Sequence, residues 1–518
     1  MANKEEFTAS INEGYNFKGD SIILGAAILK GETLPGVFVE LPLKTMNRHG
    51  LIAGATGTGK SKTLQIISEG LSSKSIPVLL MDIKGDLSGL AKPGVNNSKI
   101  EERAQKIGIT YTASGYPVEL MTISEEKGIR LRATVSEFGP VLFSKILELN
   151  DTQSGVVSLI FKYCDDNQLP LLDLKDFKKM LQYVSDEGKK EIESEYGKIS
   201  TSTTGTILRK VIELEQQNAD LFFGETSFEV EDLLKINEEG KGIISIIRLT
   251  DIQNRPKLFS TFLLCLLVEI YNTFPEEGDS DQPKLVIFID EAHLFFSEAS
   301  KALLNQIETI IKLIRSKSVG IFFCTQNPTD IPDSVLSQLG MKIQHSLRAF
   351  TANDRKQIKL IAANYPMSEF YNIEELLTSM GIGEAAVTVL SEKGSPTPLC
   401  ATLLCPPASR MDILSLDEIN EIVNKSKLVK KYNEAIDRES AYEILTKKLV
   451  EAQQTAEQGD SVQDKTSSGK EEKSTVEKVL TSTTARQVGR TVARELTRGL
   501  LGVLGIGGSS RRKKTGWF

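Results

Sequence analysis

The sequence predicts an α/β fold: a doubly wound, mainly parallel sheet with an inserted, mostly helical domain. The first observation is a glycine-rich loop at residues 54–61, which separates a short apolar segment from an amphipathic one. The second is a set of nearly all-apolar runs that alternate with helical patterns, at residues 78–82, 242–247, 285–290 and 319–325. Apolar runs of this kind are typical of parallel strands that are buried on both faces.

The chain divides into several segments along its length. Residues 1–47 are too few for a domain, and the alternating pattern within them predicts a short β cap. The α/β core is expected at 48–92 and 241–410, and its two parts enclose an inserted, largely helical domain at 93–240. The remaining segments are C-terminal helices at 411–451, a polar flexible linker at 452–484 and a basic amphipathic tail at 485–518.

Within the core, strands alternate with helices as a doubly wound sheet requires. The first part contains a strand at 49–53, a helix at 60–73 and a strand at 78–82. The elements expected in the second part are helices at 257–272 and 300–316, with strands at 242–247, 285–290, 319–325, 342–347, 385–390 and 399–404.

The composition is that of a soluble protein with an ample core: 518 residues, 40% of them hydrophobic and 25% charged. The N-terminus lacks the apolar stretch of a signal peptide, and the longest apolar run, 262–268, is too short to span a bilayer. Five cysteines without a C-x-x-C pair fit buried thiols in a reducing compartment. We therefore expect a cytoplasmic protein, with peripheral attachment to the inner face of the membrane as an alternative.

The glycine-rich loop matches the phosphate-binding pattern G-x-x-x-x-G-K-[ST]. Its residues and the one that follows form the candidate nucleotide-binding set: Gly54, Ala55, Thr56, Gly57, Thr58, Gly59, Lys60, Ser61 and Lys62. Glycines let backbone N–H groups curl around a phosphate, and the start of a helix adds a favourable dipole. Lys60 would contact the β- and γ-phosphates, and Ser61 would ligate Mg²⁺. The loop therefore predicts a nucleoside-triphosphate site; the alternative is a plain glycine turn that enters a helix.

Two carboxylates follow the third long apolar run, in the arrangement of a Walker B motif. Because ligands bind at the carboxyl ends of parallel strands, Asp290 would hold Mg²⁺ through its water shell and Glu291 would act as the general base. Asp82 ends a strand that we expect to lie beside the phosphate loop, and it is a further candidate for the metal site. Lys84 and Asp86, which follow it, could equally form a surface pair.

Three polar residues are candidates for the remaining catalytic roles. Gln326 follows the strand 319–325, where an amide can orient the attacking water or report hydrolysis; the alternative is a polar turn before a proline. Phosphoryl transfer calls for a guanidinium, supplied in cis or by a neighbouring subunit. Arg315, at the end of a helix, and Arg348, just after a strand, are the candidates. Arginines at helix ends are also often solvated or complement the helix dipole.

The tetrapeptide from Asp290 to His293 also matches the Asp-Glu-Ala-His motif of a large class of helicases. The chain shows neither the second core of that class nor its Ser-Ala-Thr and Gln-x-x-Gly-Arg motifs, which argues against membership. His293 has two interpretations that the sequence leaves open. It either makes contacts near the γ-phosphate or packs beneath the loop.

Positive charge is concentrated at the C-terminal end of the chain. The formal charge is −7 overall, whereas residues 485–518 carry eight Arg or Lys and one acidic residue. Arg486, Arg490, Arg494 and Arg498 are spaced to form one basic ridge on a helix, beside an apolar stripe. Such a segment can lie on an anionic membrane, bind nucleic-acid phosphates or dock on an acidic protein, or it can contact nothing specific.

Eight strings together resemble the HerA–FtsK group of P-loop ATPases, and more closely its bacterial YjgR-like branch. They are His49–Ser61, Asp82–Gly89, Arg132–Glu137, Phe288–His293, Leu313–Lys317, Thr325–Pro332, His345–Thr351 and Asp437–Glu443. The resemblance runs from about residue 10 to 450. It implies a RecA-like P-loop fold of the additional-strand, catalytic-glutamate type. It also implies a ring, usually of six subunits, with ATP at the subunit boundaries.

HerA proteins pump or unwind DNA during end processing and FtsK proteins translocate duplex DNA, so the resemblance implies a motor that acts on DNA. The sequence departs from HerA in two respects: only some 47 residues precede the core, where HerA has a β-barrel domain, and a basic tail is added. The leading hypothesis is a hexameric, Mg²⁺-dependent ATPase that moves DNA. The alternative is an ATPase whose nucleotide state controls assembly or docking to a membrane or protein partner.

Overall fold

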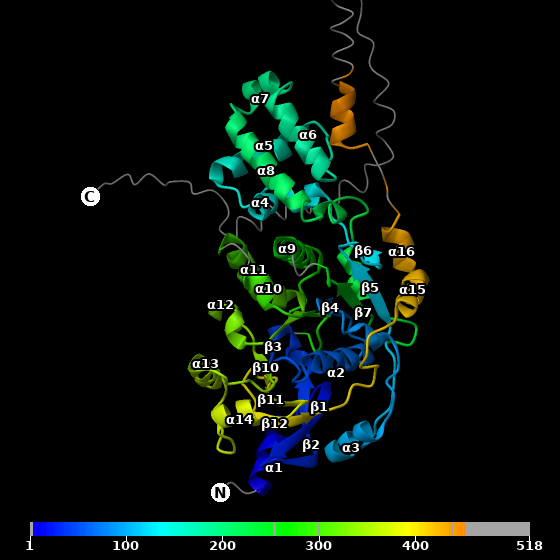
Figure 1. The fold of residues 1–518 in the computed structure, drawn as a ribbon, viewed down its shortest axis with the longest axis vertical. Helices are drawn as coiled ribbons and strands as arrows, with labels where there is room; N and C mark the ends of the chain where they lie inside the picture. Colours follow the sequence, from blue (N-terminus) through cyan, green and yellow to red (C-terminus); the bar gives the residue numbers. More distant parts are fainter. Residues whose placement is uncertain are drawn as a thin grey trace, which may run out of the picture. The chain divides into compact units, whose positions relative to one another are not determined.

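The computed structural model describes residues 4–450, except 252–254, 279, 298–300, 435, 437–438 and 449 (Figure 1). Contacts divide the described residues into two units: 4–134 with 212–436, and 135–211 with 439–450. The predicted linker at 452–484 and tail at 485–518 lie outside the described residues. Within the described part of the chain, no helix combines the length and the apolar character that a membrane span requires.

A single sheet of 12 strands forms the frame of the first unit, in the order β2-β1-β12-β11-β10-β3-β9-β8-β4-β7-β5-β6. The strands are β1 (Ser21–Leu29), β2 (Glu32–Pro42), β3 (Gly50–Ala53), β4 (Val78–Asp82), β5 (Val118–Thr122), β6 (Ile129–Arg130), β7 (Ile244–Arg248), β8 (Leu285–Ile289), β9 (Val319–Thr325), β10 (Met341–Gln344), β11 (Glu384–Thr388) and β12 (Cys400–Leu404). From β10 to β6 the paired strands are parallel, and the four strands at the other end are antiparallel. The predicted α/β fold with a mainly parallel sheet is confirmed.

Helices surround this sheet and also form the second unit (Figure 1). Those of the first unit are α1 (Lys4–Gly14), α2 (Lys60–Ser73), α3 (Ser98–Ile107), α9 (Pro256–Thr273), α10 (His293–Ser297), α11 (Lys301–Ile314), α12 (Asp333–Leu336), α13 (Ala352–Ala362), α14 (Ile373–Ser379), α15 (Leu416–Lys425) and α16 (Lys427–Tyr432). Those that begin in the second unit are α4 (Val135–Ile146), α5 (Asp151–Asp166), α6 (Leu174–Ser185), α7 (Lys189–Glu195) and α8 (Thr201–Glu215).

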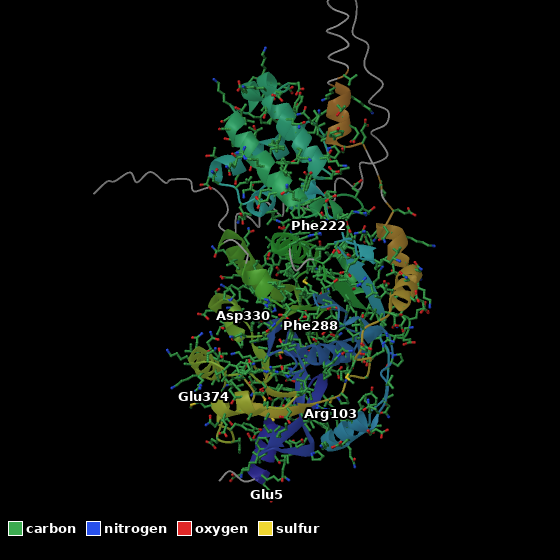
Figure 2. The ribbon with its side chains drawn as sticks, viewed as in Figure 1. Glu5, Arg103, Phe222, Phe288, Asp330 and Glu374 are labelled. Carbon is green, nitrogen blue, oxygen red and sulfur yellow. The ribbon has the colours of Figure 1, made fainter. Side chains whose placement is uncertain are left out.

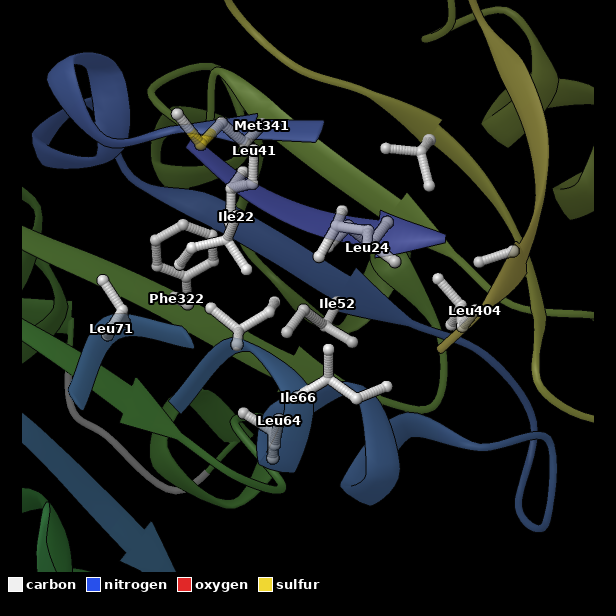
Figure 3. Close-up of a cluster of buried hydrophobic side chains, with 14 of the residues drawn as sticks. Ile22, Leu24, Leu41, Ile52, Leu64, Ile66, Leu71, Phe322, Met341 and Leu404 are labelled. Atoms are coloured by element: carbon white, nitrogen blue, oxygen red, sulfur yellow. The ribbon is translucent and has the colours of Figure 1, made fainter. Parts of the chain in front are cut away.

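Helix α2 holds the glycine-rich loop against the sheet because one of its faces is apolar. Leu64, Ile67 and Leu71, the predicted stripe, are fully buried. Figure 3 shows Leu64 and Leu71 in one cluster with Ile52 of β3 and Phe322 of β9. Burial of an aliphatic side chain contributes about 1.5–3 kcal/mol. The helix, and with it the loop at its N-terminus, is therefore fixed on these two strands.

The N-terminal residues extend the central sheet and do not form a separate cap over residues 1–47. β1 pairs with β2 on one side and with β12 on the other, antiparallel in both cases. Helix α1 packs against these strands, with Phe7 and Ile11 fully buried. The β character of this region was predicted correctly. The strand β12 was also predicted, at 399–404, but its pairing with β1 was not, because a pairing between the two ends of the core leaves no local pattern.

The inserted unit is shorter than the predicted 93–240. β5 and β6 fall within that range, but β5 pairs in parallel with β7 and so belongs to the central sheet. The second unit begins at Val135, and the chain returns to the first after Val211. Its helices enclose an aromatic cluster of Phe143, Phe161 and Phe177. The prediction was too long because β5 pairs with β7, a segment more than 100 residues later in the sequence, and such a pairing leaves no local pattern.

Candidate active site

The glycine-rich loop connects the end of β3 to the start of α2. Gly54, Gly57 and Gly59 have φ angles of 153°, 80° and 121°, which residues with a side chain rarely adopt. A Cβ on Gly54 would lie 2.4 Å from the Cβ of His345. The loop therefore has a course that only glycine permits at these positions.

Neighbouring elements hold the loop in place. The N–H of Gly54 donates to the carbonyl of Thr325, the last residue of β9, at 3.2 Å. On the other side, the N–H of Gly383 donates to the carbonyl of Thr58 at 3.0 Å. Arg103 of α3, labelled in Figure 2, donates in turn to the carbonyl of Gly383 at 3.2 Å. The loop is thus braced from both sides by contacts within the protein.

Lys60 is the first residue of α2, and its side chain turns back onto the loop. Its ammonium donates to the carbonyls of Gly54 at 2.6 Å and Ala55 at 3.3 Å. Burial lowers the pKa of Lys60, the charge of Lys84 lowers it further, and that of Glu291 opposes the shift. A phosphate oxygen would displace the two carbonyls, because it carries a negative charge that attracts the ammonium more strongly than an uncharged carbonyl does.

The strand order brings the two predicted carboxylates to the same edge as the loop. β9 lies between β3 and β8, and all three run parallel. The N–H of Ala292 donates to the carbonyl of Cys324 at 2.8 Å, which ties the turn after β8 to the end of β9. The charges of Asp290 and Glu291 both act on the ammonium of Lys60. The position of β9 between β3, which carries the loop, and β8, which carries the carboxylates, is the additional-strand arrangement that the resemblance implies.

Asp290 is 2% exposed and directly follows β8. Burial raises its pKa to about 7, against the opposing charge of Lys84. Its Oδ2 is buried without a hydrogen-bond donor among the described residues. A bare buried oxygen of this kind is costly, and a divalent cation would satisfy it. Asp290 and Ser61, in the first turn of α2, therefore fit a Mg²⁺ ion.

Glu291 stands in the turn after β8 with a left-handed backbone, at a φ of 46°. Its Oε1 forms an ion pair with Lys84, and Nδ1 of His293 lies 3.1 Å from Oε2. Burial would raise the pKa of Glu291, but the hydrogen bond and charge of Lys84 outweigh it and hold the pKa below its usual value. The carboxylate is thus ionised, as a general base must be. His293 contacts this carboxylate.

The prediction that Asp82 ends a strand beside the phosphate loop is wrong. Two strands, β9 and β8, lie between its strand and β3. Its carboxylate accepts hydrogen bonds from the N–H groups of Gly85, Asp86 and Leu87 at 2.7, 3.2 and 3.1 Å. Asp82 therefore fixes the turn after β4, and we leave it out of the proposed metal site. The error arose because strand order is not encoded in the local pattern.

Gln326 and Arg348 both lie at the edge that carries the loop. Gln326 follows Thr325 at the end of β9, between the strands of the loop and of the carboxylates, and it is exposed. Arg348 follows β10, the neighbour of β3 on the other side, and is also exposed. Its Nη2 donates to the carbonyl of Thr56 at 3.4 Å. The structure thus places both residues beside the loop of their own chain.

Arg315 lies at the opposite edge of the sheet. It is exposed and begins a short 3-10 turn, Arg315–Lys317, directly before β9. Its charge acts on His49, which directly precedes β3. β9 has seven residues, and at about 3.3 Å per residue roughly 20 Å separate Arg315 from the loop. Of the two predicted modes, only action on a nucleotide held by another copy is compatible with this position.

Lys62 belongs to the predicted nucleotide-binding set, but its side chain is engaged elsewhere. Its ammonium donates to Oε1 of Gln65 at 2.9 Å and to the carbonyl of Met411 at 2.6 Å. These bonds join α2 to the segment 408–412, whose Ser409 N–H donates to Glu69 at 2.9 Å. The ammonium of Lys62 therefore points away from the loop, which leaves only its backbone N–H for the predicted contact.

Two residues at the site have roles that sequence reasoning missed. Lys84 pairs with Glu291 and not on the surface. His345 is buried beneath the loop, where its ring nitrogens lie 2.8 Å from Oγ1 of Thr63 and 3.0 Å from the carbonyl of Glu384. Burial lowers the pKa of His345 to about 4, so the ring is neutral at pH 7. For Lys84 the available signal was a lysine two residues after a strand end.

The chain matches the model of the helicase HerA-like C-terminal family over residues 28–512. The DNA double-strand break repair helicase HerA of Sulfolobus acidocaldarius is 21% identical over 357 residues, which cover 68% of this chain and 64% of that protein. The protein of the same name from Sulfurisphaera tokodaii is 24% identical over 391 residues, 75% of this chain and 69% of that one. The match therefore spans less than two thirds of the Sulfolobus relative.

A solved structure also shares the fold. The bacterial conjugative coupling protein TrwB, in an unbound monoclinic form, superposes with a TM-score of 0.50 at 12% identity. The superposition covers 79% of this chain and 95% of TrwB. At this level of identity the similarity concerns the fold alone. The family comparison and this superposition together confirm the expected HerA-type resemblance and the RecA-like P-loop fold.

Proposed function

The chain belongs to the helicase HerA-like C-terminal family, and on this premise we propose that it is a Mg²⁺-dependent ATPase that works as a motor on DNA. One observation carries the proposal: Lys60, Asp290 and Glu291 meet at the edge of the sheet where the loop lies. They supply a cation for phosphate, a bare carboxylate oxygen for a metal and an ionised carboxylate for water. Triphosphate hydrolysis requires these three groups.

Each residue has a definite part in the proposed reaction. Backbone N–H groups of the loop would bind the phosphates, and Lys60 would exchange its two carbonyl partners for β- and γ-phosphate oxygens. Ser61 and Asp290 would hold Mg²⁺, which neutralises the charge that develops on the phosphates. Glu291 would take a proton from the attacking water as the water oxygen bonds to the γ-phosphorus and the bond from that phosphorus to the bridging oxygen breaks, which releases ADP and inorganic phosphate. Gln326, at the adjacent strand end, would orient that water.

The two arginines would act on different nucleotides. Arg348 donates to the carbonyl of Thr56 and would contact phosphate in its own chain. Arg315 would reach the site of a neighbouring chain, which supports an assembly of several copies, for which we propose a hexameric ring. An arginine supplied in this way is worth about 10³–10⁵ in rate. A mixture of Arg315→Ala chains and Glu291→Gln chains tests the arrangement. Where the two variants are neighbours, the first supplies an intact Glu291 and the second an intact Arg315, so hydrolysis should be recovered at that boundary.

DNA is proposed as the polymer because relatives in this family are named as DNA repair helicases. The decisive measurement is phosphate release from ATP by the purified full chain, with and without duplex or single-stranded DNA at low salt. We expect hydrolysis that DNA accelerates, in a particle whose mass corresponds to six chains. Hydrolysis that DNA leaves unchanged would remove the motor function and retain the ATPase.

A second function is favoured by the basic residues at 485–518. In this alternative the nucleotide state controls assembly or docking on an anionic membrane or an acidic protein partner, and the protein is cytoplasmic or attached to the inner face of the membrane. Deletion of residues 485–518 distinguishes the two functions. Loss of binding to anionic vesicles, with ATP hydrolysis intact and unresponsive to DNA, would favour the docking ATPase.

A further inference from the structure

The turn after β4 presents Lys84 on a fixed backbone. Asp82 accepts hydrogen bonds from the N–H groups of Gly85, Asp86 and Leu87, so the turn is held from within. Gly85 closes it in a left-handed conformation, at a φ of 74°. The root of the Lys84 side chain is therefore fixed, while its four-carbon stem remains flexible.

Lys84 and Glu291 form an ion pair between the turns that follow β4 and β8. These strands pair in parallel, so the two turns are neighbours at the same edge. The side chain of Glu291 is 5% exposed, whereas that of Lys84 is 34% exposed. The carboxylate is thus the buried partner and the lysine the one with access to solvent. If the pair opens, Lys84 is the residue that moves.

The ion pair occupies one side of the Glu291 carboxylate, where an attacking water would otherwise bind. Lys84 covers Oε1, and Nδ1 of His293 lies 3.1 Å from Oε2. No N–H or hydroxyl of the described residues forms a further hydrogen bond to either oxygen. A general base must accept a hydrogen bond from the water that it deprotonates. The ion pair with Lys84 also lowers the pKa of Glu291, so withdrawal of Lys84 would both uncover the carboxylate and make it a stronger base.

Lys84 also lies within the field of Lys60. Their like charges interact unfavourably, while Asp290 and Asp86 attract Lys84. Two ammonium groups that are held close together by flanking carboxylates form a site for a strong polyanion. A terminal phosphate offers three acceptor oxygens and more charge than one carboxylate. It can therefore compete with Glu291 for Lys84.

We propose that Lys84 is a latch: it binds Glu291 in the nucleotide-free chain and exchanges it for the terminal phosphate of a bound triphosphate. This inference rests on the proposed nucleotide site and adds to it a residue that distinguishes a triphosphate from a diphosphate. The exchange frees the carboxylate only when a γ-phosphate is present. Lys84 thus couples the availability of the base to the presence of the bond to be hydrolysed.

Nucleotide binding by the full chain tests the latch without reliance on turnover. The probes are a non-hydrolysable ATP analogue and ADP, each titrated with Mg²⁺. Lys84→Met is expected to weaken the analogue about tenfold and to change ADP affinity less than about twofold. Lys84→Arg keeps the charge and should restore most of the analogue affinity. The control is Lys74→Met, which removes the same charge from the far end of α2, where Lys74 pairs with Asp20.

The outcomes separate the latch from the nucleotide site on which it rests. If the unmodified chain binds neither probe, the proposed function fails and the latch fails with it. If the unmodified chain binds both, but Lys84→Met weakens both equally or weakens neither, the latch alone is overturned. A selective loss for the analogue, reversed by arginine, supports it.

A second measurement follows the ion pair itself and remains decisive if Lys84→Met proves too unstable for titration. Glu291→Gln weakens the hold on Lys84, so this variant should bind the analogue about threefold more tightly and ADP unchanged. An unchanged analogue affinity would overturn the latch. Thermal unfolding of the nucleotide-free chain provides a further check, because the shifts caused by Lys84→Met and Glu291→Gln should not add when both residues are changed.

Discussion

Asp82 and Asp290 each come after an apolar run in the sequence. Asp82 is the last residue of β4, and Asp290 directly follows β8, the parallel neighbour of β4. They are 1% and 2% exposed, and burial raises the pKa of Asp82 to about 6 and that of Asp290 to about 7. Their hydrogen bonding differs. Three N–H groups donate to Asp82, whereas Oδ2 of Asp290 has no donor among the described residues. One carboxylate holds a turn, and the other is available to a cation.

The difference arises from the backbone of the two turns. After β4 the chain folds back on itself through Gly85, which directs successive N–H groups onto Asp82. After β8 the backbone N–H of Glu291 donates to Asp290, but that of Ala292 donates to Cys324 of β9, so Oδ2 of Asp290 has no donor among the described residues. Burial and pKa therefore do not distinguish a structural carboxylate from a metal ligand in this protein. The two kinds of carboxylate are distinguished by the number of N–H groups that donate to them.

Asp290→Asn should produce the largest effect. Without the carboxylate, Mg²⁺-dependent hydrolysis is expected to fall about 10³-fold, because a bound metal stabilises transition-state charge by several kcal/mol. The free energy of unfolding without nucleotide should not fall, since the change removes a buried carboxylate whose Oδ2 has no donor among the described residues. Phosphate release and denaturant unfolding measure the two quantities. A variant that hydrolyses ATP normally at moderate Mg²⁺ would remove Asp290 from the metal site.

Asp82→Ala should show the reverse pattern. Loss of the acceptor leaves N–H groups of the turn unsatisfied, and the free energy of unfolding is expected to fall by about 1–3 kcal/mol. Hydrolysis at a temperature where the variant is folded should fall less than about tenfold, through the displaced Lys84. Asp82→Asn keeps one acceptor oxygen and serves as the milder control. If Asp82→Ala abolishes the Mg²⁺ dependence while stability is unchanged, the structural role of Asp82 is contradicted and Asp82 is again a candidate metal ligand.

The pH dependence of stability should separate the same two residues. In the unfolded chain both carboxyl groups titrate near a pKa of about 3.9. Because both folded pKa values are raised, the folded chain binds more protons, and stability falls as pH rises from the unfolded to the folded pKa. For the nucleotide-free chain we expect the two groups together to cost several kcal/mol of stability between about pH 4 and pH 7.

Denaturant unfolding of the two asparagine variants over this pH range provides the measurement. Asp82→Asn should remove the part of the slope that extends to about pH 6, and Asp290→Asn the part that extends to about pH 7. Variants with the same slope as the unmodified chain would show that neither carboxyl titrates in the folded state as described.

The local parts of the site could be predicted from the sequence. The loop 54–61 and the pair Asp290 and Glu291 are each encoded by a few consecutive residues, and their geometry follows from the strand and helix on either side. The meeting of Lys60 with these carboxylates was predicted from the rule that parallel strands share an edge. These predictions needed only the direction of each strand.

The parts that depend on strand order could not be predicted in this way. Nothing near Asp82 indicates that β9 and β8 lie between its strand and β3, and nothing near Lys84 indicates that Glu291 is its partner. Arg315 is a different case, because a residue directly before a parallel strand must lie at the amino edge. The sequence already contained that information, and it excludes a contact with the phosphate loop of the same chain.

The smallest expected effect concerns the backbone of the turn after β8. Glu291 has a φ of 46°, in the region where the turn after β4 uses Gly85. A residue with a side chain pays about 1–2 kcal/mol for this conformation. Glu291→Gly should therefore unfold with a free energy about 1 kcal/mol higher than Glu291→Gln, although both variants lack the base and hydrolyse little ATP. Denaturant unfolding of the two proteins without nucleotide gives the difference.

Ala292→Gly is the matched control for this last comparison. Ala292 is not among the described residues with a positive φ, so glycine there should lower stability by about 0.5–1 kcal/mol through the entropy of the unfolded chain. Equal stabilities of Glu291→Gly and Glu291→Gln would show that the turn is unstrained. The expected gain would mean that the chain keeps a carboxylate where glycine would be more stable. That is the pattern of a turn in which a reactive group is retained at the expense of stability.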